Sequence, residues 1–208
     1  MKKKVMAAIS VLAFLFTFST VSMADTMKVV DGPGDVSAGL FYATTGVYGS
    51  FGTFCLETNE NISLGKYYNY SIETYAIAGG TGGKVEVSPG VYGDPISPAT
   101  AYLYTQFMLG AYAITNFEMS SLQVAFWILE NENYSGLGVT PAMVTRANEL
   151  ITEAYNAGWQ TIGDVRVANL YEGRTLKQSM LILVPEPMTL ILLGLGLLGL
   201  GATRRFKK

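Results

Sequence analysis

The sequence predicts an α+β fold, a single domain with short antiparallel strands and about three helices. Three observations predict it. About 160 residues remain once two terminal segments of unusual composition are set aside, enough for one core. Short runs rich in β-branched and aromatic residues, separated by Gly and Asn, fill the first half of the remainder. Helical stripes with capping residues fill most of the second half.

The N-terminal segment has the pattern of a signal peptide. Lys2 to Lys4 give a positive start, Val5 to Val21 are largely apolar, and Ser22-Met23-Ala24 places small residues where a signal peptidase cuts. We predict cleavage after Ala24, so residues 1–24 are the signal peptide and signal peptidase is a partner. The competing interpretation is an uncleaved N-terminal anchor.

Residues 25–184 form the predicted mature domain, which begins with a loose glycine-rich lead-in through Gly39. Strands are then expected where apolar or alternating residues recur. The glycine-rich stretch 79–83 is predicted to be a flexible turn, because no Lys-Ser or Lys-Thr follows it as in a phosphate loop. The expected strands are Leu40 to Ala43, Phe51 to Glu57, Tyr70 to Ala78, Val165 to Tyr171 and Gln178 to Val184.

Three helices are expected between the third and fourth of these strands. Ser97-Pro98 is typical of a helix start, and this helix is predicted to run to about Ala113. Ser120 and Gln123 have capping-box spacing before a second helix. Thr140-Pro141 opens a third helix, and Gly158 is its predicted stop.

The C-terminal segment, residues 185–208, combines three features. Pro185-Glu186-Pro187 precedes an uncharged stretch of sixteen residues, 188–203, and Arg204-Arg205 begins a basic end. A helix of that length reaches about 24 Å, short of a hydrocarbon core of about 30 Å. The sequence therefore predicts a C-terminal transmembrane helix that suits a temporary anchor, with the basic end in the cytoplasm.

This order of features resembles the PEP-CTERM sorting signal of Gram-negative bacteria, which is handled by the membrane protease exosortase. The resemblance implies exosortase as a partner, inner-membrane transit, and then a cell-surface or extracellular location, often alongside exopolysaccharide in a biofilm matrix. The alternative is an ordinary tail-anchored helix. The residues that carry the sorting signal are Pro185, Glu186, Pro187, Arg204 and Arg205.

Charge and composition exclude several classes of function. Residues 25–187 hold seven Lys or Arg against sixteen Asp or Glu, a net charge of −9, so no nucleic-acid partner is expected. The chain has no histidine, which removes the usual general base of hydrolases and the commonest transition-metal ligand. We therefore expect neither an enzyme nor a metal site nor a cofactor. One cysteine, Cys55, excludes an intramolecular disulfide.

Two short elements of the domain resemble the halves of bacterial surface thioester domains. These are Phe54-Cys55-Leu56-Glu57 and Leu122-Gln123-Val124-Ala125-Phe126-Trp127, although Leu122 stands where the family usually has Thr. In that family the Cys and Gln side chains become joined. By this resemblance Cys55 matches the family's cysteine, and the second element is matched by Gln123, Ala125 and Trp127.

The resemblance implies that Cys55 and Gln123 form a thioester that attaches covalently to surface amines. The residues alone leave other roles open: Cys55 as a buried apolar residue, Gln123 as a capping side chain after Ser120, and Trp127 as core packing. The sequence thus leaves two functions, an exported adhesion protein with a reactive bond, or a structural exopolysaccharide-binding matrix protein without one. Three further acids are expected on a solvated helix face: Glu130, Glu132 and Glu149.

Overall fold

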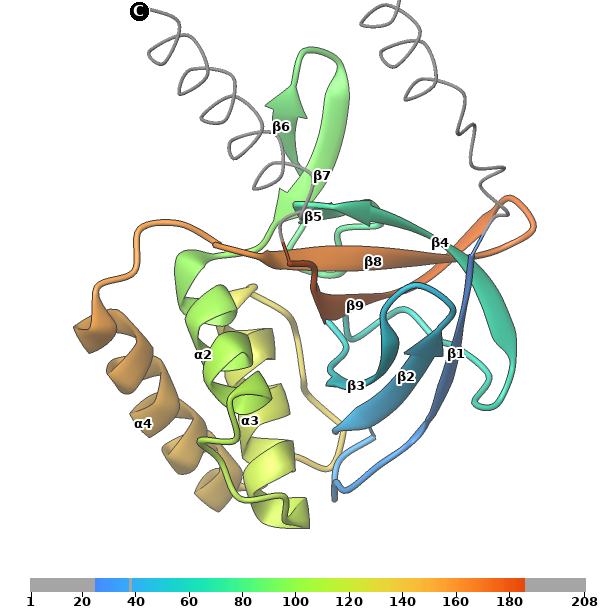
Figure 1. Cartoon of the computed structure of the whole chain (residues 1–208). Coiled ribbons are helices and arrows are strands. Elements are labelled where there is room, and N and C mark those ends of the chain that lie inside the picture. Colours follow the sequence, from blue (N-terminus) through green and yellow to red (C-terminus); the bar gives the residue numbers. More distant parts are fainter. Residues whose placement is uncertain (1–24, 38, 186–208) are drawn as a thin grey trace, which may run out of the picture.

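A computed structural model of the protein describes residues 25–37 and 39–185, and in this part of the chain nine strands and three helices form (Figure 1). Six strands make one antiparallel sheet in the order β3-β2-β1-β4-β8-β9. The α+β class is confirmed. The bounds of these strands are β1 Thr26–Asp31, β2 Phe41–Thr45, β3 Gly49–Thr53, β4 Tyr67–Glu73, β8 Val165–Glu172 and β9 Thr175–Leu183.

The six-stranded sheet curls until its two ends meet. The segment after β3 runs beside β9, where Cys55 forms a bridge with Met180. The N–H of Leu181 donates to the Phe54 carbonyl at 3.2 Å. Closure satisfies backbone groups that an open sheet edge leaves unpaired. It also fixes the position of Cys55 in the wall of a small barrel.

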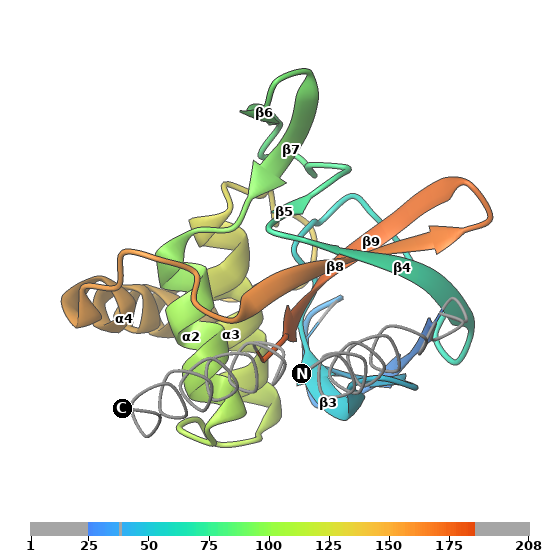
Figure 2. The ribbon, with the colours of Figure 1, turned by 45° about the horizontal axis from the view of Figure 1, so that its top comes forward.

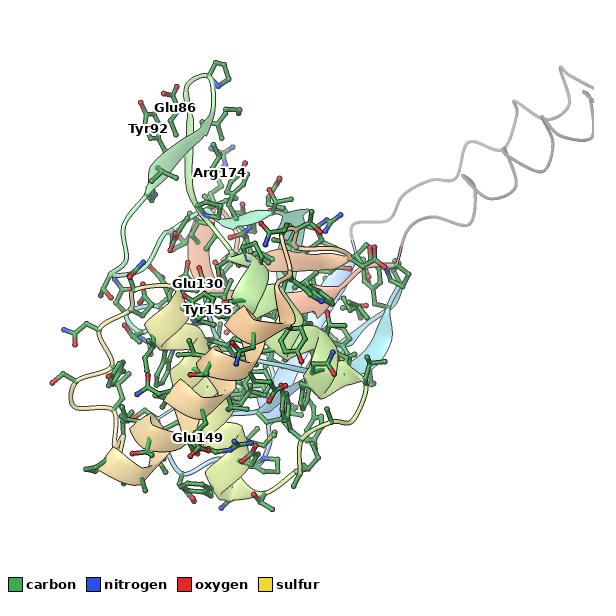
Figure 3. The ribbon with its side chains drawn as sticks, turned by 90° about the vertical axis from the view of Figure 1, so that its left-hand side faces the viewer. Glu86, Tyr92, Glu130, Glu149, Tyr155 and Arg174 are labelled. Atoms are coloured by element: carbon green, nitrogen blue, oxygen red, sulfur yellow. The ribbon has the colours of Figure 1, made fainter. Side chains whose placement is uncertain are left out.

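A smaller sheet, in the order β5-β7-β6, branches from the end of β4. Its strands are β5 Tyr75–Ala76, β6 Val85–Ser88 and β7 Val91–Pro95. Figure 2 shows the hairpin of β6 and β7 standing away from the helices and the large sheet. Glu86 and Tyr92 lie on this projecting hairpin (Figure 3).

The three helices, α2 Pro98–Met108, α3 Asn116–Leu129 and α4 Pro141–Ala157, pack side by side against the barrel (Figure 1). Two of the predicted caps are confirmed. The Ser97 side chain accepts the Thr100 N–H and caps α2, and the Thr140 side chain caps α4. Gly158 ends α4 in the left-handed conformation, at φ 68°, which glycine adopts without strain.

Two apolar clusters follow from the alternation of side chains along the strands. One fills the barrel, with members such as Met27, Ala43 and Met180. The other joins the barrel wall to the helices. Phe54 belongs to the second cluster and packs on Phe107 of α2 and Phe126 of α3, with ring centroids 5.0 and 5.1 Å apart. These contacts hold the Cys55 segment against the helical layer.

The structure corrects three expectations. The lead-in predicted to be loose contains β1, at the centre of the large sheet. The first helix ends at Met108, because the N–H groups of Leu109 and Gly110 bond back and Gly110 turns the chain at φ 79°. The second helix begins after Thr115, not at Ser120. No helix within the described residues is long and apolar enough to cross a membrane.

Candidate functional site

Cys55 lies two residues beyond β3, in the segment that closes the barrel. Its neighbour Leu56 donates its N–H to the Ser179 carbonyl at 3.0 Å, which keeps the segment extended. Side chains alternate along such a segment, so Leu56 packs in the helix-side cluster and Cys55 in the barrel cluster. Cys55 is 4% exposed.

Gln123 comes from the middle of α3 and meets Cys55 from the helical side. The Cys55 N–H donates to Gln123 Oε1 at 3.1 Å, and Gln123 Nε2 donates to the Cys55 carbonyl at 2.8 Å. The side-chain amide thus pairs with the backbone of Cys55 much as a neighbouring strand would. The structure brings together the two residues that the resemblance singled out, although they are 68 positions apart.

The capping interpretation of Gln123 is wrong. The N-cap of α3 is Thr115, whose side chain accepts the Glu118 N–H at 3.2 Å. Ser120 lies inside the helix, and its hydroxyl oxygen accepts the Asp35 N–H at 2.7 Å. Gln123 is consequently two turns into α3 and free to bond across to the barrel wall.

The other two residues of the second element are also buried. Ala125 is fully buried and Trp127 is 1% exposed, and both pack in the helix-side cluster. Trp127 lies four residues after Gln123, so the two side chains lie on the same side of α3. Its indole N–H has no hydrogen-bond partner among the described residues.

The surroundings of Cys55 keep its thiol protonated. Burial raises the pKa of the Cys55 thiol far above its ordinary value, and the nearby carboxyl group of Glu57 raises it further. Desolvation disfavours the thiolate in this way at any apolar site. A reaction at this sulfur therefore needs the proton to move to another group as the new bond forms.

A cavity of about 170 Å³ adjoins Cys55 and opens between the barrel and the segment that follows it. Sequence reasoning missed this cavity and the role of Glu57 in its wall. The spacing of Cys55 and Glu57, two apart on an extended segment, was the available signal. The lining residues are Ser37, Phe41, Cys55, Glu57, Thr58, Glu60, Asn61, Ile62, Leu64, Trp127, Leu137 and Gln178.

Glu57 is a buried carboxyl group held by hydrogen bonds from two sides. The Ser179 N–H donates to Oε2 at 2.8 Å, and the Ser179 hydroxyl lies 2.9 Å from Oε1. The Gly79 N–H donates to Oε1 at 3.3 Å. Burial raises the pKa of Glu57 to about 7, because desolvation outweighs these donors. Glu57 can therefore bind and release a proton near neutral pH.

A second group of buried acids follows α3, where the sequence predicted a solvated helix face. That prediction is wrong for Glu130 and Glu132, which are 6% and 5% exposed. Glu132 accepts hydrogen bonds from Thr58 and Thr81 side chains and from backbone N–H groups. Glu149 does lie at the surface of α4, where it pairs with Arg146 (Figure 3).

Within the described residues, no group of three or more Cys, Asp or Glu side chains is placed to hold a metal ion. Several predicted features lie outside the part of the chain that the structure describes. They are the signal cleavage site at Ala24, the helix at 188–203, and the sorting residues Glu186, Pro187, Arg204 and Arg205. Pro185 is the last described residue.

Comparison with known proteins bears on both parts of the chain. Residues 183–205 match the family model of the PEP-CTERM protein-sorting motif, so the sorting motif expected from the sequence is confirmed. No curated protein matches the chain significantly in sequence.

Two solved structures are similar to the chain, and both are thioester domains. One is the N-terminal thioester domain of a surface protein from Clostridium perfringens, at 15% identity and a TM-score of 0.46. It covers 76% of this chain and 96% of that one. The other is the N-terminal thioester domain of the fibronectin-binding protein SfbI from Streptococcus pyogenes, at 10% identity and a TM-score of 0.47. The match covers 82% of this chain and 98% of that one.

Proposed function

We propose that this is an exported protein that exosortase sorts to the cell surface, where its domain attaches covalently to amines through a Cys55–Gln123 thioester. The PEP-CTERM motif at residues 183–205 supports the sorting half. One observation carries the covalent half: the buried Gln123 amide bonds to both backbone groups of Cys55. This pairing holds a side-chain acyl group against the backbone of the protein's single cysteine.

Thioester formation exchanges one bond for another. The Cys55 sulfur attacks the side-chain carbonyl carbon of Gln123, the carbon–nitrogen bond breaks, and the thiol proton leaves with the nitrogen as ammonia. Holding the two groups together replaces a strong base, because proximity alone lowers such barriers by several kcal/mol, about 7 or more in the best cases. The Cys55 N–H, at 3.1 Å from Oε1, stabilises the negative oxygen that develops.

The thioester then reacts with an amine on a neighbouring surface and leaves a stable amide at Gln123. Each molecule reacts once, so the protein is a covalent adhesion module and not an enzyme. Signal peptidase and exosortase process its two ends, and the inner membrane holds it in transit. The acidic domain, with a net charge of −9 over residues 25–187, attracts amine-bearing surfaces and repels nucleic acid.

A second function is a structural exopolysaccharide-binding protein of the biofilm matrix with no reactive bond. Two observations favour it. Gln123 already has partners for its amide oxygen and nitrogen, as a structural glutamine would. Burial also raises the pKa of the Cys55 thiol, as for an inert core cysteine.

Mass spectrometry separates these functions. We would express the full sequence, purify the protein without reducing agent, and compare it with a Cys55→Ala variant treated identically. Once the substitution is accounted for, the wild-type protein should be lighter than the variant by about 17 Da, the ammonia lost in thioester formation. It should also lack an alkylatable thiol after denaturation, and methylamine should restore the thiol and add mass at Gln123. An unchanged mass with a free thiol would leave the structural function.

A further inference from the structure

The cavity beside Cys55 is small, and much of its wall is apolar. Its volume of about 170 Å³ suits a group of five or six heavy atoms, because a cavity of about 150 Å³ holds one benzene molecule. Phe41, Ile62, Leu64 and Leu137 provide apolar surface. Such walls favour a slender aliphatic chain over a sugar ring rich in hydroxyl groups.

The charged groups in the wall are all acidic. Glu57 and Glu60 line the cavity, and no lysine or arginine is among its described lining residues. Two carboxyl groups without a basic partner favour a cation and disfavour a carboxylate or phosphate. Glu57 is the deeper of the two, because it is 2% exposed whereas Glu60 is partly exposed.

Trp127 gives an independent sign of a ligand. Its side chain lines the cavity, is 1% exposed, and leaves its indole N–H without a partner. A buried donor in this state lowers stability unless a ligand or water supplies an acceptor. The indole ring face also attracts cations.

We propose that this cavity binds a primary ammonium group on a slender aliphatic chain, with Glu57 as the group that accepts its proton before the amine reacts. The binding half stands without the thioester. The reaction half rests on the function proposed above.

In the reaction half, the attacking nitrogen loses two protons and the acyl carbon exchanges sulfur for nitrogen. Glu57 takes one proton from the ammonium group, and the freed lone pair forms a bond to the acyl carbon of Gln123. The carbon–sulfur bond breaks, and the electron pair leaves with the Cys55 sulfur, which takes a second proton from the attacking nitrogen. The products are an amide at Gln123, a thiol at Cys55 and a protonated Glu57.

The groups that face Glu57 suit this exchange. Cys55 and Glu60 are the titratable groups from its own segment, while β9 contributes the uncharged Ser179 and Gln178, and the turn after β5 contributes the Gly79 N–H. Burial raises the pKa of Glu57 to about 7. A proton acceptor works best when its pKa lies close to the working pH.

The binding half is tested in a Cys55→Ser variant of the full chain, which keeps the cavity nearly unchanged and cannot form a thioester. The probe is n-butylammonium, and the readout is the pair of indole N–H resonances of Trp127 and Trp159. The Trp127 resonance should move and saturate while that of Trp159 stays. 1-Butanol and butyrate should cause little change. An unchanged Trp127 resonance would refute the binding site. So would shifts with 1-butanol and butyrate that equal the shift with n-butylammonium.

Carboxyl variants in the same background locate the cation. Glu57→Gln should weaken butylammonium binding about tenfold or more, because it removes a buried charge partner. Glu86→Gln, on the projecting hairpin, should leave it unchanged. Should Glu57→Gln fail to fold, Glu60→Gln should still weaken binding from the outer wall. Unchanged affinity in the folded variants would overturn the assignment.

The reaction half is tested with Cys55 intact. If the wild-type protein shows the deficit of about 17 Da, butylamine should consume it at pH 7 about 100-fold faster than in Glu57→Gln, the usual size of a general-base effect. Equal rates would remove Glu57 as the proton acceptor while leaving the thioester in place. A wild-type protein without the deficit would instead refute the proposed function. The binding measurement would still show whether the cavity binds an ammonium group.

Discussion

Two buried acidic sites of this domain differ in what surrounds them. Glu132 receives hydrogen bonds from the Thr58 N–H and hydroxyl, the Thr81 hydroxyl and the Gly82 N–H. Glu57 receives bonds from Ser179 and Gly79, and it also lines an open cavity. A carboxyl group enclosed by protein donors fastens loops together. One that borders a cavity still has room for a ligand.

The turn at residues 79–83 connects the two sites. Its first N–H donates to Glu57, and its Gly82 N–H donates to Glu132 at 2.8 Å. Gly80 sits at φ 45°, and a Cβ there would lie only 2.1 Å from the Glu132 carboxyl oxygen. Glycine is therefore required for close approach as well as for backbone conformation. The prediction that this turn is flexible is therefore wrong, because hydrogen bonds hold it to both Glu57 and Glu132.

The largest effect is expected from breaking the enclosed site. Glu132→Ala leaves buried donors on two loops without an acceptor, and it should lower the free energy of unfolding by about 3–5 kcal/mol. Urea denaturation measures this. The control Glu149→Ala, on the exposed face of α4, should cost about 1 kcal/mol or less. Equal losses would show that burial of Glu132 contributes nothing.

The stability that the cavity site contributes should depend on pH. Folding raises the pKa of Glu57 from 4.5 to about 7, so the folded protein holds this proton more tightly than the unfolded chain does. The resulting stability is fully present below pH 4.5 and is lost as pH rises through 7. The loss amounts to about 3 kcal/mol, at about 1.4 kcal/mol per pKa unit.

Urea denaturation between pH 4 and pH 8 measures this loss. Glu57→Gln should remove the part due to Glu57 and leave the part due to Asp94, whose pKa burial and the nearby Glu130 and Glu132 raise to about 7. Glu149→Gln should keep the wild-type pH dependence. An unchanged pH dependence in Glu57→Gln would mean that Glu57 titrates alike in the folded and unfolded chains.

The sequence predicts the parts of this fold that local chemistry determines. The capping residues Ser97 and Thr140 and the stop at Gly158 mark helix ends directly, because their side chains or backbone act within one turn. The strand β1 was missed because the glycine-rich segment after it obscures a short alternation. The start of α3 was misplaced because Ser120 has capping spacing but bonds to Asp35 instead.

The candidate site depends on contacts that no local pattern contains. Cys55 and Gln123 were singled out by resemblance, and their pairing spans 68 residues. Glu132 looked like a residue of a solvated helix face, because its donors come from positions 50 and 74 residues earlier in the chain. Periodicity reports which face of a helix is apolar, but it cannot report that distant loops bring donors to an acid.

A smaller loss is expected from removing one donor at the enclosed site. Thr81→Val keeps the shape of the side chain but removes the hydroxyl that donates to Glu132 at 3.1 Å and accepts the Asn133 N–H at 2.7 Å. The substitution should lower the free energy of unfolding, measured by urea denaturation, by about 1–2 kcal/mol. Thr145→Val, which removes an exposed hydroxyl on α4, is the matched control and should cost about 0.5 kcal/mol or less. If Thr81→Val loses no more stability than Thr145→Val, the Thr81 hydroxyl does not hold the loops together at Glu132.

Of the substitutions at the two sites, the corresponding one at the cavity site should change stability least. Ser179→Ala removes a hydroxyl 2.9 Å from Glu57 but keeps the backbone N–H bond at 2.8 Å, so it should cost about 1 kcal/mol. Its clearer effect is on titration. A donor to a carboxylate lowers its pKa, so the pH at which stability falls should move upward from about 7. Thr81→Val should leave that pH where it is. An unchanged pH in Ser179→Ala would mean that the hydroxyl does not act on Glu57, and the two sites would then differ in enclosure alone.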